Sequence, residues 1–145
     1  MTAPSSQETP RPVATITSYH AHVYFDGPAE REAAAWLRER AAERFAVMLG
    51  RWHDQPVGPH AKPMFQIAFT VADFATLVPW LMLNRRGLSI LVHPNTGQQY
   101  DDHVVNPLWL GAQLPIDGSV LPRGAGEGNG AIDPVTPNTV PVLKA

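Results

Sequence analysis

Residues 18–27 read SYHAHVYFDG, an aromatic and apolar run that contains two histidines and ends in a turn signal. Aromatic and β-branched residues favour strands, and Asp-Gly-Pro marks a turn, so we predict a strand over residues 16–25. Side chains alternate between the two faces of a strand. His20 and His22 therefore share one face with Ser18 and Tyr24, while the other face receives Tyr19, Ala21, Val23 and Phe25.

The chain after this strand alternates between helical and strand patterns. Ala33, Trp36, Leu37 and Ala41 recur at helical spacing and predict a helix over residues 28–44, with Pro28 in its first turn. We expect further strands over 45–53, whose first residues could instead extend the helix, over 64–71 and over 88–94, and a second helix over 73–84.

In that second helix Asp73 is the expected N-cap, Pro79 interrupts the helix or shifts its start, and Gly87 closes it. The resulting βαββαβ order predicts an α+β, ferredoxin-like split βαβ fold with a four-stranded antiparallel sheet and both helices on one face. We call the other face the open face. It must meet solvent, a ligand or a second subunit.

A third histidine is expected on the open face. In the strand over 88–94, Leu88, Ile90 and Val92 suit the core, which leaves Ser89, Leu91 and His93 on the other side. The first and fourth strands are neighbours in a ferredoxin-like sheet, one of them at the edge, so His93 can lie beside His20 and His22. A lone histidine in a strand is usually a packing or surface residue. Three imidazoles on adjacent strands indicate a site for Fe, Zn, Cu or Ni.

The remaining histidines lie in predicted loops or at a strand end. His60 and His103 could join the site as ligands, acid/base groups or substrate contacts. His53 follows Trp52 and is better explained as a half-buried surface residue. Asp101 and Asp102 could orient a histidine, although acidic pairs in loops are more often solvated.

Composition excludes several classes of function. The 145 residues are 44% hydrophobic and 17% charged, with a net charge of −2. Nucleic-acid-binding proteins usually carry an excess of basic residues, so this charge argues against a nucleic-acid partner. There is no cysteine, which rules out disulfides and thiolate metal sites. Residues 1–15 lack the apolar segment of a signal peptide, and no apolar run approaches the roughly 20 residues that span a membrane. We therefore expect a cytoplasmic protein with no membrane partner.

Both ends of the chain are poor in periodic pattern. Pro, Ser and Thr are frequent in residues 1–15, and Gly and Pro in residues 115–145. Such segments bury too little apolar surface to fold alone. We expect a disordered segment over 1–15, one domain over 16–114 and a tail over 115–145.

Several motifs resemble those of the DOPA 4,5-dioxygenase family. They are YHAHVYFD, RWHDQPVGPH, MFQIAF, LVPWLMLNRRGLSILVHPNTG, and DDH followed by WLG, in order across residues 18–114. The resemblance implies a ferredoxin-like fold, commonly dimeric, and extradiol opening of a catechol ring with O₂. The histidine-rich motifs of the family fall on His20, His22, His60, His93 and His103. Family members often have a second histidine before WLG, where this chain has Asn106.

Extradiol cleavage requires Fe(II), or another divalent metal, with open coordination positions on one side. The predicted strands of the open face carry no Asp or Glu, so a three-histidine site is the simplest arrangement. We expect His20, His22 and His93 to be metal ligands, and His60 and His103 to be catalytic acid/base or substrate-contacting residues. His60 could replace His20 as a ligand. The expected partners are DOPA or another substituted catechol, O₂, and a second copy in a homodimer.

Two other functions fit the same residues. The protein could be a non-enzymatic module that binds a metal or small ligand, with Asn106 marking lost catalysis. It could also be a structural dimer whose histidines line the subunit interface. Metal content and O₂ consumption separate these hypotheses.

Overall fold

The computed structural model describes residues 9–123 and residue 141. It contains one antiparallel sheet in which the strands lie in the order β2-β3-β1-β4-β5. The main elements are β1 (Ser18–Tyr24), α1 (Gly27–Arg44), β2 (Met48–His53), β3 (Met64–Thr70), α2 (Phe74–Asn84), β4 (Ile90–Asn95) and β5 (Leu108–Leu110). The first four strands and two helices confirm the α+β, split βαβ arrangement.

The sheet has one strand more than the sequence pattern predicts. β5 pairs with β4, with Leu91 opposite Trp109, so β4 lies inside the sheet and β2 and β5 form its edges. β5 spans three residues and follows Pro107. So short a segment shows no alternation that could be recognised, and the pairing with β4 is what makes it a strand.

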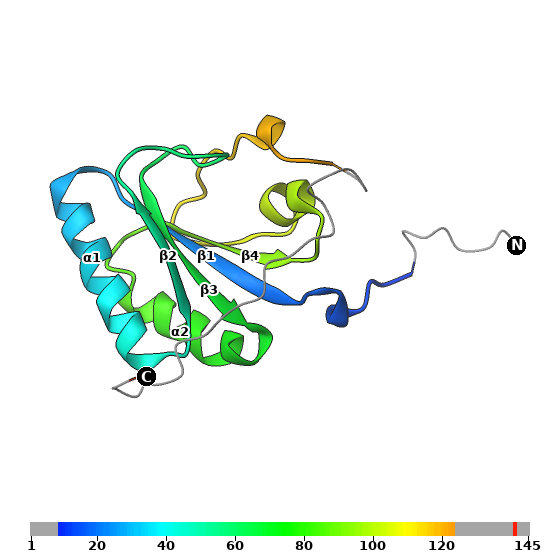
Figure 1. The fold of residues 1–145 in the computed structure, drawn as a ribbon, viewed down its shortest axis with the longest axis horizontal. Coiled ribbons are helices and arrows are strands. Elements are labelled where there is room, and N and C mark those ends of the chain that lie inside the picture. Colours follow the sequence, from blue (N-terminus) through cyan, green and yellow to red (C-terminus); the bar gives the residue numbers. More distant parts are fainter. Residues whose placement is uncertain (1–8, 124–140, 142–145) are drawn as a thin grey trace, which may run out of the picture.

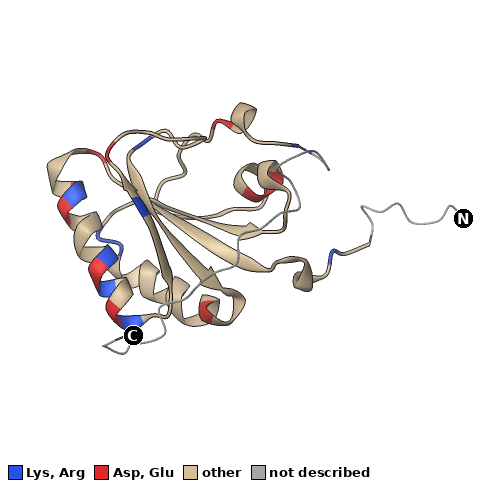
Figure 2. Ribbon diagram, viewed as in Figure 1, with Lys and Arg blue, Asp and Glu red and all other residues tan. Residues whose placement is uncertain are grey.

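The two helices cover one face of the sheet (Figure 1). Helix α1 buries Ala34, Leu37 and Ala41, while Ala33 and Trp36 of the predicted stripe are only partly buried. It ends at Arg44, and Phe45 is already extended, so the residues before Met48 neither prolong the helix nor belong to β2. Acidic and basic residues alternate along its outer side (Figure 2), as expected for a solvated helix face.

Helix α2 has Asp73 at its N-cap position, as predicted, but without the expected side-chain hydrogen bond. The Asp73 carboxylate accepts a hydrogen bond from the Thr70 hydroxyl, and Val71–Asp73 form a 3-10 turn. Pro79 lies inside the helix. Gly87 adopts a left-handed φ of 78° after the helix, which agrees with its predicted role as a terminator.

The core lies between the helices and the covered face. Ala21, Val23, Ile67 and Ile90 are fully buried there. A second, smaller cluster of Tyr24, Met64 and Leu91 lies on the open face. The open face is therefore partly covered by the chain itself.

That cover comes from residues after β4. The π-helical turn Asp101–Val105 and the segment that follows β5 lie over the open face (Figure 1). Ile116 pairs with His60 in an isolated β-bridge, and the Asp117 N–H donates to the Pro59 carbonyl. The expected division at residues 15 and 115 stays a prediction, because 1–8, 124–140 and 142–145 lie outside the described residues.

Candidate functional site

Strand register brings the three strand histidines together. His20 of β1 lies directly opposite His93 of β4, and His22 lies two positions further along the same face. Their neighbours Ala21 and Val23 are fully buried in the core on the other side of the sheet. Strand alternation therefore placed all three histidines on the open face as predicted.

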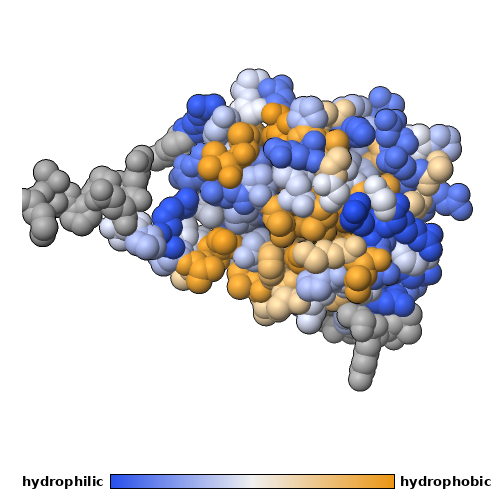
Figure 3. Space-filling view, turned by 180° about the vertical axis from the view of Figure 1, so that it is seen from behind, coloured by the Kyte–Doolittle hydropathy of each residue, from blue (hydrophilic) through white to orange (hydrophobic). Residues whose placement is uncertain are grey.

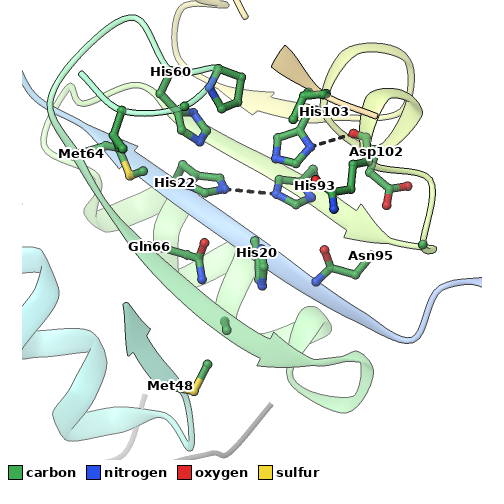
Figure 4. Close-up of a pocket in the computed structure, with 17 residues that line it drawn as sticks. His20, His22, Met48, His60, Met64, Gln66, His93, Asn95, Asp102 and His103 are labelled. Atoms are coloured by element: carbon green, nitrogen blue, oxygen red, sulfur yellow. Dashed lines mark hydrogen bonds between the residues drawn. The ribbon is translucent and has the colours of Figure 1, made fainter. Parts of the chain in front are cut away.

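The imidazoles of His22 and His93 are in direct contact. Their Nε2 atoms are 3.1 Å apart, in the centre of the open face (Figure 4). The ring centre of His20 is 5.1 Å from that of His93. His22 is 3% exposed and His93 1%, so a pair of nitrogen atoms is held almost without water.

Two histidines from outside the strands complete the cluster. His60 arrives from the loop between β2 and β3, with its ring centre 4.2 Å from that of His22. His103 arrives from the π-helical turn, 4.0 Å from the ring centre of His93. Figure 4 shows these two on one side of the His22–His93 pair and His20 on the other. Five of the six histidines in the chain thus meet at one place.

The sixth histidine, His53, is the last residue of β2 and is half-buried. It is not among the residues that line the cavity over the cluster. This position agrees with its assignment as a surface residue.

Backbone carbonyls orient two of the imidazoles. His93 Nδ1 is 2.9 Å from the Pro94 carbonyl oxygen, and His103 Nδ1 is 2.8 Å from that of Gln99. A carbonyl only accepts, so both Nδ1 atoms carry the proton and both Nε2 atoms keep a lone pair. His22 Nδ1 is buried and has no hydrogen-bond partner in the described part of the chain.

Burial favours the neutral form of four histidines of the cluster, namely His22, His60, His93 and His103. Desolvation is the largest effect on each of these four, and it lowers the pKa of His22 and His93 well below the ordinary value. The pKa of His60 falls to about 4 for the same reason. That of His103 is also lowered by burial, against the opposing effects of the Gln99 carbonyl and Asp102. Neutral imidazoles are the form that binds metal ions.

The two adjacent carboxylates have different surroundings. Asp102 is buried and accepts hydrogen bonds from the Thr96 backbone N–H at 2.9 Å and from its hydroxyl at 2.6 Å. Asp101 is exposed. Asp102 therefore ties the π-helical turn to the end of β4, and it acts on His103 through charge, with no hydrogen bond to its imidazole.

Asn106, where the family often has a histidine, lies away from the cluster. It is exposed, and it borders a separate hollow formed with residues 11–13, 15 and 16, Pro94 and Thr96. It does not line the cavity over the five histidines. The substitution therefore removes no side chain from that cavity.

The cavity over the cluster measures about 450 Å³, a size typical of small-molecule sites. Its lining also includes residues not expected from the sequence, among them Met48, Val57, Met64, Gln66, Asn95, Gln99 and Leu121. Met64 and Gln66 could have been found from the alternation in β3, because Phe65, Ile67 and Phe69 occupy its covered face. Val57 and Leu121 reach the cavity from distant parts of the chain.

The donor set suits a metal ion. His20, His22 and His93 form one group with potential ligand atoms within 4.8 Å of one another, and His22, His60 and His103 form a second. Nitrogens about 2.1 Å from one ion and at right angles lie about 3.0 Å apart. The 3.1 Å between His22 and His93 fits that spacing.

β1, β3 and β4 carry no charged residue, as Figure 2 shows. The strands therefore contribute imidazoles, amides and thioethers to the cavity, and the carboxylate that lines it, Asp102, comes from the π-helical turn. In the part of the chain that the structure describes, no helix has both the length and the apolar composition to cross a membrane.

Two curated fungal relatives match most of the chain. A 21.2 kDa protein described as uncharacterized, from Botryotinia fuckeliana, is 37% identical over 117 residues, which cover 73% of this chain and 64% of the relative. A DOPA 4,5-dioxygenase from Amanita muscaria is 35% identical over 115 residues, which cover 74% of this chain and 50% of the relative. The chain thus spans between half and two thirds of the length of these relatives.

A solved structure and a family comparison agree with these matches. The crystal structure of a candidate dioxygenase from Nostoc punctiforme superposes with a TM-score of 0.75 at 52% identity, covering 77% of this chain and 96% of that one. Residues 19–120 match the Dopa 4,5-dioxygenase family, a range that includes all five clustered histidines. The chain belongs to the Dopa 4,5-dioxygenase family.

Proposed function

We propose that this protein is an Fe(II)-dependent extradiol dioxygenase that opens the ring of DOPA or another substituted catechol with O₂. The observation that carries the proposal is the pair of desolvated Nε2 atoms of His22 and His93, 3.1 Å apart beneath a cavity of about 450 Å³. Membership of a dioxygenase family supports it.

His20, His22 and His93 would hold the ion. Bound there, Fe(II) supplies the Lewis acid and redox centre through which a catechol and O₂ can react. Three neutral imidazoles leave the ion's positive charge undiminished, which favours binding of an anionic catecholate. Three ligands would leave further coordination positions of the ion for a catechol and O₂.

His103 is suited to take the first proton from the catechol. Its Nδ1–H is engaged by the Gln99 carbonyl at 2.8 Å, so Nε2 has the free lone pair that a general base requires. The proton of a catechol hydroxyl would pass to that nitrogen and produce an imidazolium. Burial lowers the pKa of His103, and the nearby Asp102 carboxylate partly offsets this effect, so its negative charge would help to stabilise the imidazolium.

The test is anaerobic reconstitution with Fe(II), followed by addition of O₂ and a panel of catechols that includes DOPA. We expect stoichiometric O₂ uptake and a yellow ring-opened product. His93→Ala should abolish both, whereas His53→Ala, at a histidine outside the cluster, should leave them unchanged. Tight metal binding without O₂ uptake by any catechol would instead support a non-enzymatic metal-binding module.

We also propose that the protein assembles as a homodimer. The support is exposed apolar surface: Leu83 of α2 is 86% exposed, Met82 51% and Val71 48%. The side opposite to that in Figure 1 shows apolar patches between polar residues (Figure 3). Such surface often marks a protein contact. Analytical ultracentrifugation of the wild type and of Leu83→Glu tests this, and a wild-type monomer at micromolar concentration would overturn it.

A further inference from the structure

Tyr24 is a buried polar side chain that the proposed mechanism leaves without a role. It is the last residue of β1, it shares the open face with His20 and His22, and it is 1% exposed. Its ring stacks on Trp109 of β5, with ring centres 6.0 Å apart and planes 22° from parallel. Its hydroxyl lies 2.6 Å from His60 Nδ1. The short distance and the burial indicate a well-defined hydrogen bond.

The position of the proton in this bond follows from the needs of the hydroxyl. A tyrosine at neutral pH carries its proton and must donate it when buried. In the described part of the chain, His60 Nδ1 is the hydrogen-bond partner of the Tyr24 hydroxyl. If Nδ1 carried a proton and donated it, the hydroxyl proton would be buried without an acceptor, which is strongly unfavourable. Tyr24 therefore donates, and His60 carries its own proton on Nε2.

This tautomer is the reverse of that of two neighbours. His93 and His103 donate from Nδ1 to carbonyl oxygens, so each offers an Nε2 lone pair. His60 offers an Nε2–H instead, while its Nδ1 lone pair is taken by Tyr24. To bind a metal ion, an imidazole in that state would have to give up its Nε2 proton or break the bond to Tyr24, because a ligand nitrogen needs a free lone pair.

We propose that Tyr24 is a positioning residue that holds His60 as the Nε2–H tautomer, and thereby keeps His60 off the metal and makes it a hydrogen-bond donor to a substrate oxygen. The two possible ligand groups share His22 and differ in including either His60 or His20. The Tyr24–His60 bond selects the group of His20, His22 and His93. The role toward substrate rests on the proposed dioxygenase function, whereas the tautomer and the choice of ligands do not.

The tautomer can be read directly from two-bond ¹H–¹⁵N spectra of the metal-free full chain, with His60 assigned by the signals lost in His60→Asn. We expect the Nε2–H pattern for His60 and the Nδ1–H pattern for His93 and His103. Tyr24→Phe keeps the ring and removes the hydroxyl, and should change the tautomer ratio of His60 at least about tenfold. Tyr19→Phe, on the covered face, is the matched control and should leave His60 unchanged. A wild-type His60 with its proton on Nδ1 would overturn the proposal.

Zinc(II) titration, with no turnover required, tests the choice of ligands. His60→Ala should change zinc affinity by less than about threefold, whereas His20→Ala should lower it at least about 100-fold. Equal losses in both variants would overturn the proposal even if Tyr24→Phe failed to fold. A correct tautomer and ligand set in a protein that turns over no catechol would refute the dioxygenase function alone.

Discussion

The two faces of the sheet are made from the same strands but follow opposite physical rules. On the covered face Ala21, Val23 and Ile67 are fully buried beneath the helices, where removal of apolar surface from water stabilises the fold. On the open face His22 and His93 are equally buried, although burial of an imidazole opposes its protonation. Burial on the covered face stabilises the fold, and this stabilisation offsets the cost of holding neutral imidazoles together on the open face.

Shortening a core side chain on the covered face should have the largest effect on stability. Ile67 lies in β3 opposite Ala21, fully buried. Ile67→Ala leaves a cavity and should lower the free energy of unfolding by about 2–5 kcal/mol. Urea denaturation of the metal-free protein measures this. Val13→Ala, at a 78% exposed position outside the proposed dimer contact, should stay within about 0.5 kcal/mol. A change as small at Ile67 would contradict the assignment of this face as the core.

Acid should destabilise the protein through its open face. The pKa of His60 is about 4 in the folded state, so the unfolded chain, near 6.5, takes up protons first as the pH falls. The free energy of unfolding should be constant above pH 6.5 and decline toward pH 4, by up to about 3 kcal/mol for His60 alone. Urea denaturation between pH 7 and 5, with metal removed by chelation, measures the decline. In His60→Asn the free energy of unfolding should decline less steeply with falling pH. Equal slopes in the variant and the wild type would contradict the attribution of this decline to His60.

Removal of a strand histidine should cost metal affinity. His93→Ala takes away one of the two nitrogens that lie 3.1 Å apart, and affinity for Fe(II) or zinc(II) should fall at least about 100-fold, or nearly 3 kcal/mol. Isothermal titration calorimetry under anaerobic conditions measures the change. His53→Ala provides the comparison, and a similar loss there would mean that the metal binds elsewhere.

The smallest expected effect separates two neighbouring carboxylates. Asp102→Ala removes two hydrogen bonds to Thr96 and should lower the free energy of unfolding by about 2 kcal/mol. Asp101→Ala, at an exposed position, should change it by less than about 0.5 kcal/mol. Thermal denaturation of both variants measures the difference. If the two losses were equal, Asp102 would not be what ties the π-helical turn to β4.

Much of the fold followed from patterns within single elements. Alternation in residues 18–25 separated His20 and His22 from Ala21 and Val23, and the same argument put His93 on the open face. β5 escaped this reasoning because three residues contain no period. Asp73 is the N-cap residue of α2 as predicted, but its carboxylate accepts a hydrogen bond from the Thr70 hydroxyl and caps no backbone N–H.

The candidate site depended more strongly on contacts between distant residues. His60 and His103 were recognised as candidates from their loops. Nothing in the sequence indicates that the ring centre of His60 lies 4.2 Å from that of His22, or that the ring centre of His103 lies 4.0 Å from that of His93. Asn106 became a candidate through its place in a motif, and the structure shows it exposed and outside the lining of the cavity. Sequence neighbours of a histidine are poor guides to its neighbours in space.

The sequence by itself determined which side chains each strand turns toward the open face, because the backbone geometry of a strand has a period of two whatever surrounds it. Only the tertiary structure decided that His20 stands opposite His93, that the chain after β4 returns to cover the cluster, and that Tyr24 meets His60 Nδ1. Register and loop paths depend on packing across the whole sheet. The proton on each imidazole depends in turn on the partner that this packing supplies.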